Sequence, residues 1–476
     1  MMKVYLINMP FFEQEYTKFS EKWEYIEDEY IGVGIVQKIL EEEGCEVIVN
    51  QETSIRTMVR KIMLLRPDTV MISVMQTSAR LSFEFVKKVR EAGYQGILFL
   101  GGWFMKMAWR EVFLHNWEVD YVCYCDAEPV LRKWLRKPSG IHIGIADKAN
   151  FGFHNRLKIE QIREICTFPE NYIIPSRRTG RRTYCLETSR GCPHSHCTFC
   201  SQSCGNAIKN KWQPVPLELI KAQILEMYEK YHAVRFSTSD DDMLGFSEQA
   251  EQRAKELHDM FLSLPFRISF STSISVRSAT NGRILDYLTE AGLEQLCVGF
   301  ESADAVQLKH YGKQQSLEEN FKAAEEITKR NIPMLPGLIT FDPFATKETV
   351  SKNLSFLFDH LHHYNLGKLT KKLHILTGTP IQKMVEKAGL LTGDYLYYDY
   401  RFQNQEAERL YQDFKEYTEM ARSIQQRADR GNLQLRQRIG MCHRTVAEHI
   451  LAGKDWKELA NLEALKMIEI LEENQL

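Results

Sequence analysis

The sequence predicts an α/β protein with an N-terminal doubly wound, Rossmann-like parallel sheet, then a partial (β/α)6 barrel, then a helical C-terminal extension. Two observations predict the sheets: short β-branched runs alternate with amphipathic stretches over residues 1–150, and the same rhythm resumes at residue 183. A third predicts the extension, because the sequence beyond residue 385 is helical in pattern, polar and rich in Glu, Arg and Gln. Alternating strands and helices are typical of a parallel sheet covered by helices.

The N-terminal unit, residues 1–150, is expected to form five strands joined by helices. Residues 151–182 interrupt this rhythm with Pro169 and Pro175, so a linker is expected there. The expected strands are Val4–Asn8, Cys45–Val49, Thr69–Val74, Ile97–Leu100 and Val119–Tyr124, and the expected helices include Gly32–Gly44 and Leu81–Ala92.

The second unit, residues 183–385, contains six strand–helix repeats in series, which predicts a partial barrel. Active residues of such a barrel lie at the C-terminal ends of its strands. Residues 386–476 are expected to form a separate helical domain. The expected barrel strands are Tyr184–Thr188, Ala233–Ser237, Arg267–Thr272, Gln295–Phe300, Met334–Thr340 and Lys368–Ile375, with helices over Leu217–Tyr231, Ser247–Leu262, Asn281–Ala291, Leu317–Lys329 and Lys347–His360.

Composition excludes several classes of protein. The formal net charge of −2 gives no reason to expect a nucleic-acid partner. No run of roughly 18 apolar residues occurs, and no secretory signal is visible, so no membrane span and a cytoplasmic location are expected. The 11 cysteines are then expected to be thiols or metal ligands rather than disulfides.

Three cysteines, Cys192, Cys197 and Cys200, lie within nine residues, directly after the first expected barrel strand. Close thiols on a short loop can wrap one iron–sulfur cluster, each thiolate holding one iron, and three ligands leave a fourth iron open for a substrate or cofactor. Gly191 permits the tight turn that this requires. The alternative is a zinc site in a zinc-structured binding protein, with the fourth ligand from His194, His196 or Cys204.

The segment Glu187-Thr-Ser-Arg-Gly-Cys-Pro, followed by Cys-Thr-Phe-Cys-Ser, resembles the cluster loop of the radical S-adenosylmethionine (SAM) superfamily, in the branch with an N-terminal cobalamin-binding domain. Its first cysteine spacing is one residue longer than is usual in that branch. The string His196-Cys-Thr-Phe-Cys200 also resembles enzymes that modify ribosomally made peptides. The resemblance implies a [4Fe-4S] cluster on Cys192, Cys197 and Cys200, with Phe199 among the cofactor-binding residues.

Later segments resemble the same branch, in the same order. Val298-Gly-Phe-Glu-Ser302 is similar to a strand end near SAM, which implies roles for Glu301 and Ser302. Arg277 resembles an arginine that suits the methionine carboxylate. Leu376-Thr-Gly-Thr-Pro380 resembles the segment that closes the sixth strand. The run Asp240, Asp241 and Asp242 resembles the acidic end of the second strand, without indicating which aspartate meets the methionine amino group.

Each of these residues also has a structural interpretation. The aspartates can cap a helix, Glu301 can form a surface salt bridge, and Arg277 can be a solvated charge.

In the N-terminal unit, ligands are expected at the C-terminal ends of the strands. The loops there resemble the corrin- and nucleotide-tail-contacting loops of cobalamin domains. No Asp-x-His-x-x-Gly motif occurs, so Met75 or Gln76 is considered for the lower face of the corrin, with simple loop packing as the alternative. The residues implied to bind cobalamin are Asn8, Pro10, Ser73, Met75, Gln76, Thr77, Gly101 and Gly102.

In the C-terminal part, Tyr395, Tyr397 and Tyr398 are predicted to line the substrate cavity as catalytic phenols, with packing as the alternative. A run of arginines is either a solvated helix face or a contact for an acidic substrate such as a leader peptide. These arginines are Arg422, Arg427, Arg430, Arg436, Arg438 and Arg444.

The resemblance implies that an electron from the cluster cleaves SAM, and that the resulting 5′-deoxyadenosyl radical abstracts hydrogen from an unactivated carbon. If methylcobalamin is bound, the substrate radical then takes its methyl group; the alternative is that the N-terminal domain keeps the fold without the cofactor. The function predicted on this basis is a C-methyltransferase for a natural-product precursor, a peptide or a small molecule, with a flavodoxin- or ferredoxin-type electron donor. The alternative within the family is a cyclase, epimerase or rearranging enzyme without methyl transfer.

Overall fold

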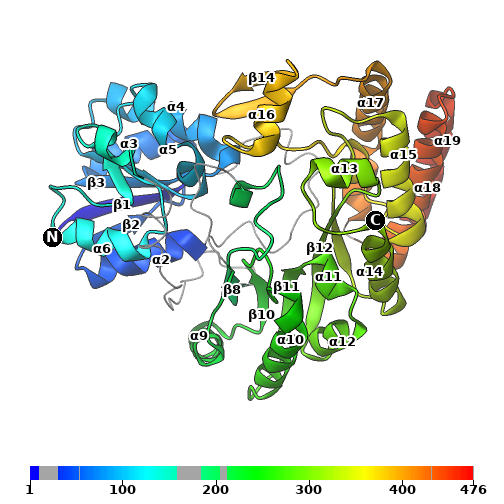
Figure 1. The fold of residues 1–476 in the computed structure, drawn as a ribbon, viewed down its shortest axis with the longest axis horizontal. Coiled ribbons are helices and arrows are strands. Elements are labelled where there is room, and N and C mark those ends of the chain that lie inside the picture. Colours follow the sequence, from blue (N-terminus) through cyan, green and yellow to red (C-terminus); the bar gives the residue numbers. More distant parts are fainter. Residues whose placement is uncertain (10–30, 53, 158–183, 204–211, 430, 475–476) are drawn as a thin grey trace.

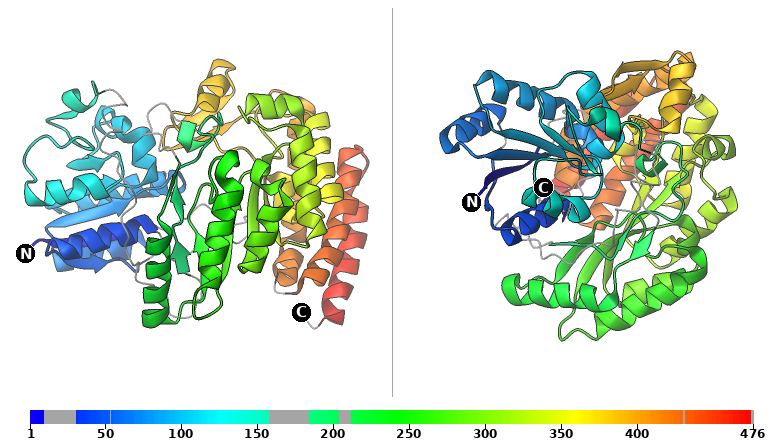
Figure 2. Two further views of the ribbon diagram at one scale, coloured as in Figure 1. Left: turned by 60° about the horizontal axis from the view of Figure 1, so that its bottom comes forward. Right: turned by 60° about the vertical axis from the view of Figure 1, so that its left-hand side comes forward.

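The computed structural model describes residues 1–9, 31–52, 54–157, 184–203, 212–429 and 431–474 (Figure 1). Pro10, Cys204, Arg430 and most of the expected linker therefore lie outside the described residues. The N-terminal domain (blue to cyan) and the barrel (green to yellow) lie side by side, and the C-terminal helices (orange to red) cover the barrel on the side away from the N-terminal domain (Figures 1 and 2).

The N-terminal sheet has the strand order β2-β1-β3-β4-β5-β6. Neighbouring strands from β2 to β5 are parallel, and β6, which was not expected, is antiparallel to β5. The chain winds outward in both directions from β1, so the predicted doubly wound sheet is confirmed. The strands are β1 (Lys3–Asn8), β2 (Glu46–Val49), β3 (Thr69–Ser73), β4 (Ile97–Gly101), β5 (Tyr121–Cys123) and β6 (Ile145–Asp147).

Helices of this domain bury apolar stripes against the sheet, for example Val33, Ile35 and Ile39 of α2. The helices are α2 (Ile31–Glu42), α3 (Ile55–Leu65), η1 (Gln76–Ser78), α4 (Ala79–Glu91), α5 (Trp103–Leu114), α6 (Glu128–Arg136) and α7 (Phe151–His154).

The barrel sheet has the order β13-β12-β11-β10-β7, and all its pairings are parallel. A short antiparallel pair, β8 and β9, follows β7. These strands are β7 (Tyr184–Leu186), β8 (Ser189–Arg190), β9 (Gln213–Pro214), β10 (Arg235–Thr238), β11 (Ser269–Ile274), β12 (Leu293–Glu301) and β13 (Met334–Leu338).

The predicted sixth barrel strand, Lys368–Ile375, is wrong. Residues Leu366–Thr370 instead form a 3-10 turn, η4, in which the Asn365 side chain accepts from Gly367 N. Beyond it, Lys372 forms a single parallel bridge with Phe341. Pairing does not extend because Thr340 N and Phe341 N both donate to the one carbonyl of Lys371.

The barrel helices cover the outer face of the sheet, which buries Phe236, Phe270 and Phe300 completely. The side chain of Ser316 accepts from Glu319 N at the start of α14, and the Glu319 side chain reaches back to the Ser316 N–H. The helices are α9 (Leu217–Tyr231), α10 (Ser247–Leu262), α11 (Val276–Ala279), α12 (Gly282–Glu290), α13 (Ala305–His310), α14 (Leu317–Lys329), α15 (Lys347–Ser355), the π-helical turn η3 (Phe356–His360) and α16 (Pro380–Lys387).

The segment after the barrel begins with an antiparallel hairpin that was not expected, β14 (Leu391–Asp394) and β15 (Tyr397–Tyr400). Its tight pairing leaves no room for a side chain at Gly393, where a Cβ would lie 2.3 Å from Tyr397 O. The predicted helical extension follows as α17 (Gln405–Ala428), α18 (Leu433–Leu451) and α19 (Lys457–Glu473). Within the described ranges, no helix is long and apolar enough to span a membrane.

The hairpin ties the N-terminal domain to the barrel, and it lies above their junction with α16 (Figure 1). Arg80 on α4 forms an ion pair with Asp394 at 3.0 Å. Gln76 Nε2 donates to Leu396 O at 2.9 Å, and Trp117 Nε1 donates to the hydroxyl of Tyr395 at 2.6 Å. The two domains are therefore joined by side-chain contacts well beyond the linker.

Candidate cofactor and active site

A cavity of about 500 Å³ lies where the two domains meet. One wall comes from the C-terminal ends of β3, β4 and β5 and from α2, and the other from the ends of β7 and β10 and from residues that flank the cysteine loop. The described lining does not include Cys192, Cys197 or Cys200 themselves. The N-terminal wall is largely apolar, with Leu6, Ile31, Val33, Ile35, Val36, Met71, Ile72, Met75, Phe99, Trp103 and Leu131. The barrel wall is polar, with Glu187, Ser189, Arg190, Ser201, Gln202, Ser237, Thr238, Ser239 and Asp241.

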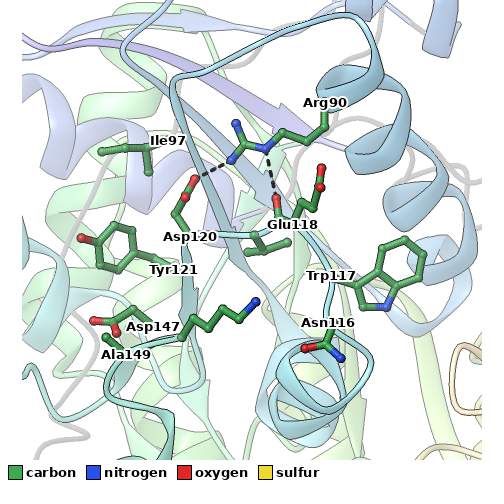
Figure 3. A pocket seen from close by; sticks show the side chains of 11 residues that line it. Arg90, Ile97, Asn116, Trp117, Glu118, Asp120, Tyr121, Asp147 and Ala149 are labelled. Carbon is green, nitrogen blue, oxygen red and sulfur yellow. Dashed lines mark hydrogen bonds and ion pairs between the residues drawn. The ribbon is translucent and has the colours of Figure 1, made fainter.

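A second hollow, of about 530 Å³, lies at the N-terminal ends of β4 and β5 (Figure 3). Its Arg90 donates to Asp120 at 2.6 Å and to the carbonyl of Glu118 at 3.1 Å. These bonds hold the chain that leads into β5. The lining of this hollow includes no residue of the cysteine loop, so the cavity between the domains is the candidate site.

Hydrogen bonds from the barrel fix the cysteine loop. Thr198 N donates to Tyr311 O and Thr198 Oγ1 donates to His310 O, each at 2.8 Å. Ile381 N donates to Thr198 O at 2.9 Å, which ties the loop to the start of α16. Gly191 enters the loop at φ 86°, a left-handed conformation that glycine adopts without strain. The loop is thus shaped by the protein.

The three thiols of the loop lie in a desolvated setting. Burial raises the pKa of Cys192 to about 11 and that of Cys200 to about 12, and it also raises the pKa of Cys197. Buried thiols of this kind stay protonated at neutral pH until a metal displaces their protons.

In the described part of the chain, no group of three His, Cys, Asp or Glu side chains is placed to share one metal ion. A [4Fe-4S] cluster asks each thiolate for a different iron, and a soft sulfur donor set suits it. The residues therefore fit the cluster.

The three consecutive aspartates have separate positions. Asp240 is buried and accepts from Thr188 N, Thr188 Oγ1 and Ser189 N at 2.6–2.9 Å, while burial raises its pKa to about 6. Asp242 accepts from the backbone of the turn that follows it, and burial raises its pKa to about 7. Of the three, Asp241 alone is among the described residues that line the cavity.

The Asp241 carboxylate accepts from Gln202 Nε2 at 2.7 Å. Desolvation by the surrounding protein raises its pKa, and the hydrogen bond from Gln202 and nearby Lys106 oppose this shift.

The downstream residues lie in two kinds of setting. Glu301 ends β12 with a φ of 63°, and its carboxylate lies 3.3 Å from Lys313 Nζ. Ser302 is fully buried, with Oγ in hydrogen-bonding distance of Gln307 and Asn353, so it fixes the chain after β12. Arg277 is partly exposed.

The Arg277 guanidinium donates to Glu319 at 3.0 Å and to the carbonyl of Gln314. The fork of Arg277 is thus already engaged in the described structure.

On the N-terminal side, Ser73, Met75, Gly101 and Gly102 line the cavity. Gly102 has φ 91°, and a Cβ there would lie 2.6 Å from Val74 N, so only glycine fits without strain. Asn8 lies at the end of β1.

Asn8 Oδ1 and Thr77 Oγ1 are buried, with no hydrogen-bond partner among the described residues. Both polar atoms of the Gln76 amide are hydrogen-bonded: Nε2 donates to Leu396 O in the hairpin, and Oε1 accepts from Thr377 N before α16.

The tyrosines predicted to be catalytic attach the hairpin to the N-terminal domain. Tyr395 packs in the core of that domain, stacks on His115 at 4.5 Å and accepts from Trp117, and burial raises its pKa to about 12. Tyr398 packs between the same core and a small cluster beside α16. The described cavity wall does not include Tyr395, Tyr397 or Tyr398. Phe199 packs edge-on against Tyr311 at 5.3 Å.

An ion-paired bridge between the two domains was not anticipated from the sequence. Arg190 donates to Glu128 of α6 at 2.8 Å and, through two nitrogens, to Glu187 at 2.9 Å. Lys106 of α5 forms a second pair with Asp126 at 2.5 Å. All of these side chains line the cavity.

Burial of Glu128 raises the pKa of its carboxyl. Burial alone would lower the pKa of Arg190, but the two carboxylates outweigh this and raise it. Glu187 and Arg190 are three residues apart in the cysteine motif, whereas nothing in the sequence marks a partner 62 residues earlier.

Comparison with known proteins supports this site. A sequence model of the radical SAM superfamily matches residues 186–357. The 4′-phospho-dehydrooxetanocin synthase of Priestia megaterium is 23% identical over 334 residues. That match covers 64% of this chain and 44% of the relative, so the chain spans less than half the length of this curated protein.

Two solved structures are similar in fold over most of this chain. The cobalamin-dependent SAM radical enzyme OxsB, with aqua-cobalamin and SAM bound, matches with a TM-score of 0.69 at 18% identity, over 95% of this chain and 72% of OxsB. The radical SAM methyltransferase TsrM from Kitasatospora setae matches with a TM-score of 0.61 at 17% identity, over 83% and 78%. Residues 186–357 therefore match the radical SAM superfamily, and the fold of the chain is similar to that of the cobalamin-dependent radical SAM enzymes.

Proposed function

We propose that this protein is a cobalamin-dependent radical SAM C-methyltransferase that acts on an unactivated carbon of a natural-product precursor. The observation that carries the proposal is the cavity between the domains. It joins the glycine-bearing edge of the N-terminal sheet to the residues that flank the cysteine loop, so ligands of the two domains would meet in one space.

The N-terminal wall suits cobalamin. A corrin presents a broad apolar face, which matches the largely apolar N-terminal wall of the cavity. Gly101 and Gly102 allow a bulky ligand to approach the backbone closely. Met75 is the candidate for the lower corrin face, since it lines the cavity while Gln76 is bound to the hairpin.

The barrel wall suits the cluster and SAM. Cys192, Cys197 and Cys200 would each hold one iron, and Asp241 would accept from the methionine amino group. Glu301 would accept from a ribose hydroxyl. When bound, these cofactors supply a carbon-centred radical and cobalamin supplies the methyl group. The protein's own task is to orient them and exclude water.

The rearranging alternative also has support. The curated relative is named a synthase rather than a methyltransferase, whereas TsrM is named a methyltransferase. A synthase of this kind would use the same cluster and cavity without transferring a methyl group.

The substrate is proposed to be a peptide or a small molecule, with a flavodoxin- or ferredoxin-type protein as electron donor. The peptide is favoured by the His196–Cys200 string. The C-terminal arginines add nothing to it, because several are already ion-paired within the chain: Arg422 with Glu419, Arg438 with Glu473, and Arg444 with Asp359 and Glu448.

The test is anaerobic reconstitution with iron, sulfide and hydroxocobalamin, followed by gel filtration. The wild-type protein should retain both a broad absorbance near ~400 nm from the cluster and the corrin bands. Cys192→Ala should lose the cluster and SAM cleavage but keep the corrin. The control is Cys45→Ala, at a free cysteine directly before the edge strand β2, which should behave as wild type.

Retention of zinc without the ~400 nm band would overturn the cluster assignment. A wild-type protein that loads the cluster but loses the corrin would overturn cobalamin dependence. Deuterated-methyl SAM with mass spectrometry of the product then separates methyl transfer from rearrangement.

A further inference from the structure

A short segment after α13 packs directly against the cysteine loop. Besides the bonds from Thr198 to His310 and Tyr311, Gly312 approaches the loop so closely that a Cβ there would lie 2.8 Å from His196 O. Gly312 has φ 65°, which favours glycine at this point. Lys313 therefore directly follows a residue that lies against His196 and Thr198, the two neighbours of Cys197 in the loop.

The Lys313 ammonium is held in place by β12. Its Nζ lies 3.3 Å from the Glu301 carboxylate and donates to Gly299 O at 3.1 Å. A Cβ at Gly299 would lie 2.6 Å from Glu301 Oε1 and 3.1 Å from Lys313 Nζ, so this glycine provides the space for the pair. The side chains are only 17% and 14% exposed, which removes most solvent screening.

Lys313 remains charged in this setting. Burial lowers its pKa, but the attraction of Glu301 and of the nearby Cys197 and Cys192 outweighs burial, so the net effect raises the pKa. A fixed positive charge therefore acts on the cysteine loop.

We infer that the positive charge of Lys313 raises the reduction potential of the cluster, and that the negative charge of Glu301 limits this effect. The inference rests on the cluster assignment and not on cobalamin. Reduction adds one negative charge to a cluster already bound by three thiolates, so a nearby cation stabilises the reduced form. Net charge around a cluster is among the factors that set its potential.

Because the two charges have opposite signs, removing each one should shift the reduction potential of the cluster in opposite directions. Lys313→Met removes the cation and leaves the carboxylate of Glu301 unpaired beside the cluster, so the potential should move to a more negative value. Glu301→Gln leaves the cation unopposed, so the potential should move to a more positive value. The double variant should lie between the two single variants, near the wild type.

The experiment is a redox titration of the reconstituted cluster, followed by electron paramagnetic resonance, without SAM, cobalamin or substrate. Lys313→Arg keeps the charge and should stay close to the wild-type potential. Lys309→Met removes an exposed lysine four residues earlier and should leave the potential unchanged.

A wild-type potential in Lys313→Met at full iron content would overturn the inference. If that variant fails to load the cluster, Glu301→Gln decides alone, since an unchanged potential there would also overturn it. Corrin retention is measured on separate samples, so failure of cobalamin binding would leave this result unaffected.

Discussion

The two walls of the cavity have the same backbone origin and different chemistry. Both are built from the C-terminal ends of parallel strands, where α/β folds place their ligands. The N-terminal wall is largely apolar and owes its shape to glycine and apolar side chains. The barrel wall presents mainly carboxylates and hydroxyls, and Ser237 Oγ and Gln202 Oε1 lie there without partners among the described residues. One wall thus suits a large ligand held by surface contact, and the other suits small polar cofactors held by directed bonds.

Removing the bridge between the walls should have the largest effect on stability. Arg190→Met leaves Glu128 and Glu187 buried without their cation, which costs about 3–5 kcal/mol in comparable buried pairs. Denaturant titration of the apo-protein measures it. Arg136→Met, which breaks a pair whose arginine is 70% exposed and screened by solvent, should cost far less. Equal costs for both variants would show that the bridge adds little to stability.

The shape of the N-terminal wall can be tested at Gly102. Gly102→Ala should cost about 2–3 kcal/mol of stability through backbone strain and overlap with Val74, and it should weaken corrin retention while cluster content is unchanged. Gly93→Ala is the matched control, because Gly93 has nearly the same φ with nothing within 4 Å. Loss of the cluster together with the corrin would contradict a division of labour between the walls.

The chemistry of the barrel wall can be tested at Asp241. Asp241→Asn should weaken SAM binding about tenfold, because a charge-assisted hydrogen bond becomes a neutral one. Equilibrium dialysis with labelled SAM on the reconstituted protein measures this. Corrin retention should not change. Unchanged SAM affinity would reject Asp241 as the residue that meets the amino group.

Asp242 should make stability depend on pH. Its folded-state pKa of about 7 lies above the ordinary value of 3.8, so its contribution to stability is present at low pH and is lost as pH rises toward 7. Asp242→Asn should therefore gain stability relative to wild type between pH 4 and pH 7. Asp259→Asn is the control, because pairing with Lys255 lowers the pKa of Asp259 below 3.8, so its effect on stability should not change with pH in this range. Denaturant titrations across this range decide it.

The smallest effect is expected at Tyr395, which lies outside both walls. Tyr395→Phe removes the acceptor of Trp117 Nε1 and should cost about 1 kcal/mol. SAM cleavage and product formation should stay at wild-type rates. A loss of product formation at unchanged stability would favour the catalytic interpretation of this phenol over packing.

Much of the fold follows from sequence because each parallel strand is a short β-branched run between helices. The predicted strands therefore match the observed ones within a few residues, as at Thr69–Val74 and β3. The sixth barrel strand fails because one carbonyl, that of Lys371, accepts two donors, which no residue pattern announces. The hairpin at 391–400 was not predicted, because residues 386–476 were expected to be helical and its tyrosines were expected to line a substrate cavity.

The candidate site divides in the same way. The cysteine loop is local in sequence, so spacing and resemblance reveal it. The bridge from Arg190 to Glu128 joins residues far apart, and the position of Lys313 depends on how Gly312 meets the loop. Even adjacent aspartates take different surroundings, because Asp240 and Asp242 bind the backbone while Asp241 faces the cavity.

The attachment of the hairpin has a consequence for biosynthesis. The core of the N-terminal domain includes Tyr395 and Leu396, and Tyr395 follows its partner Trp117 by 278 residues. A ribosome must therefore make the whole barrel before the first domain can complete its own core. Until then, the part of the N-terminal core that contacts Tyr395 and Leu396 lacks these two side chains.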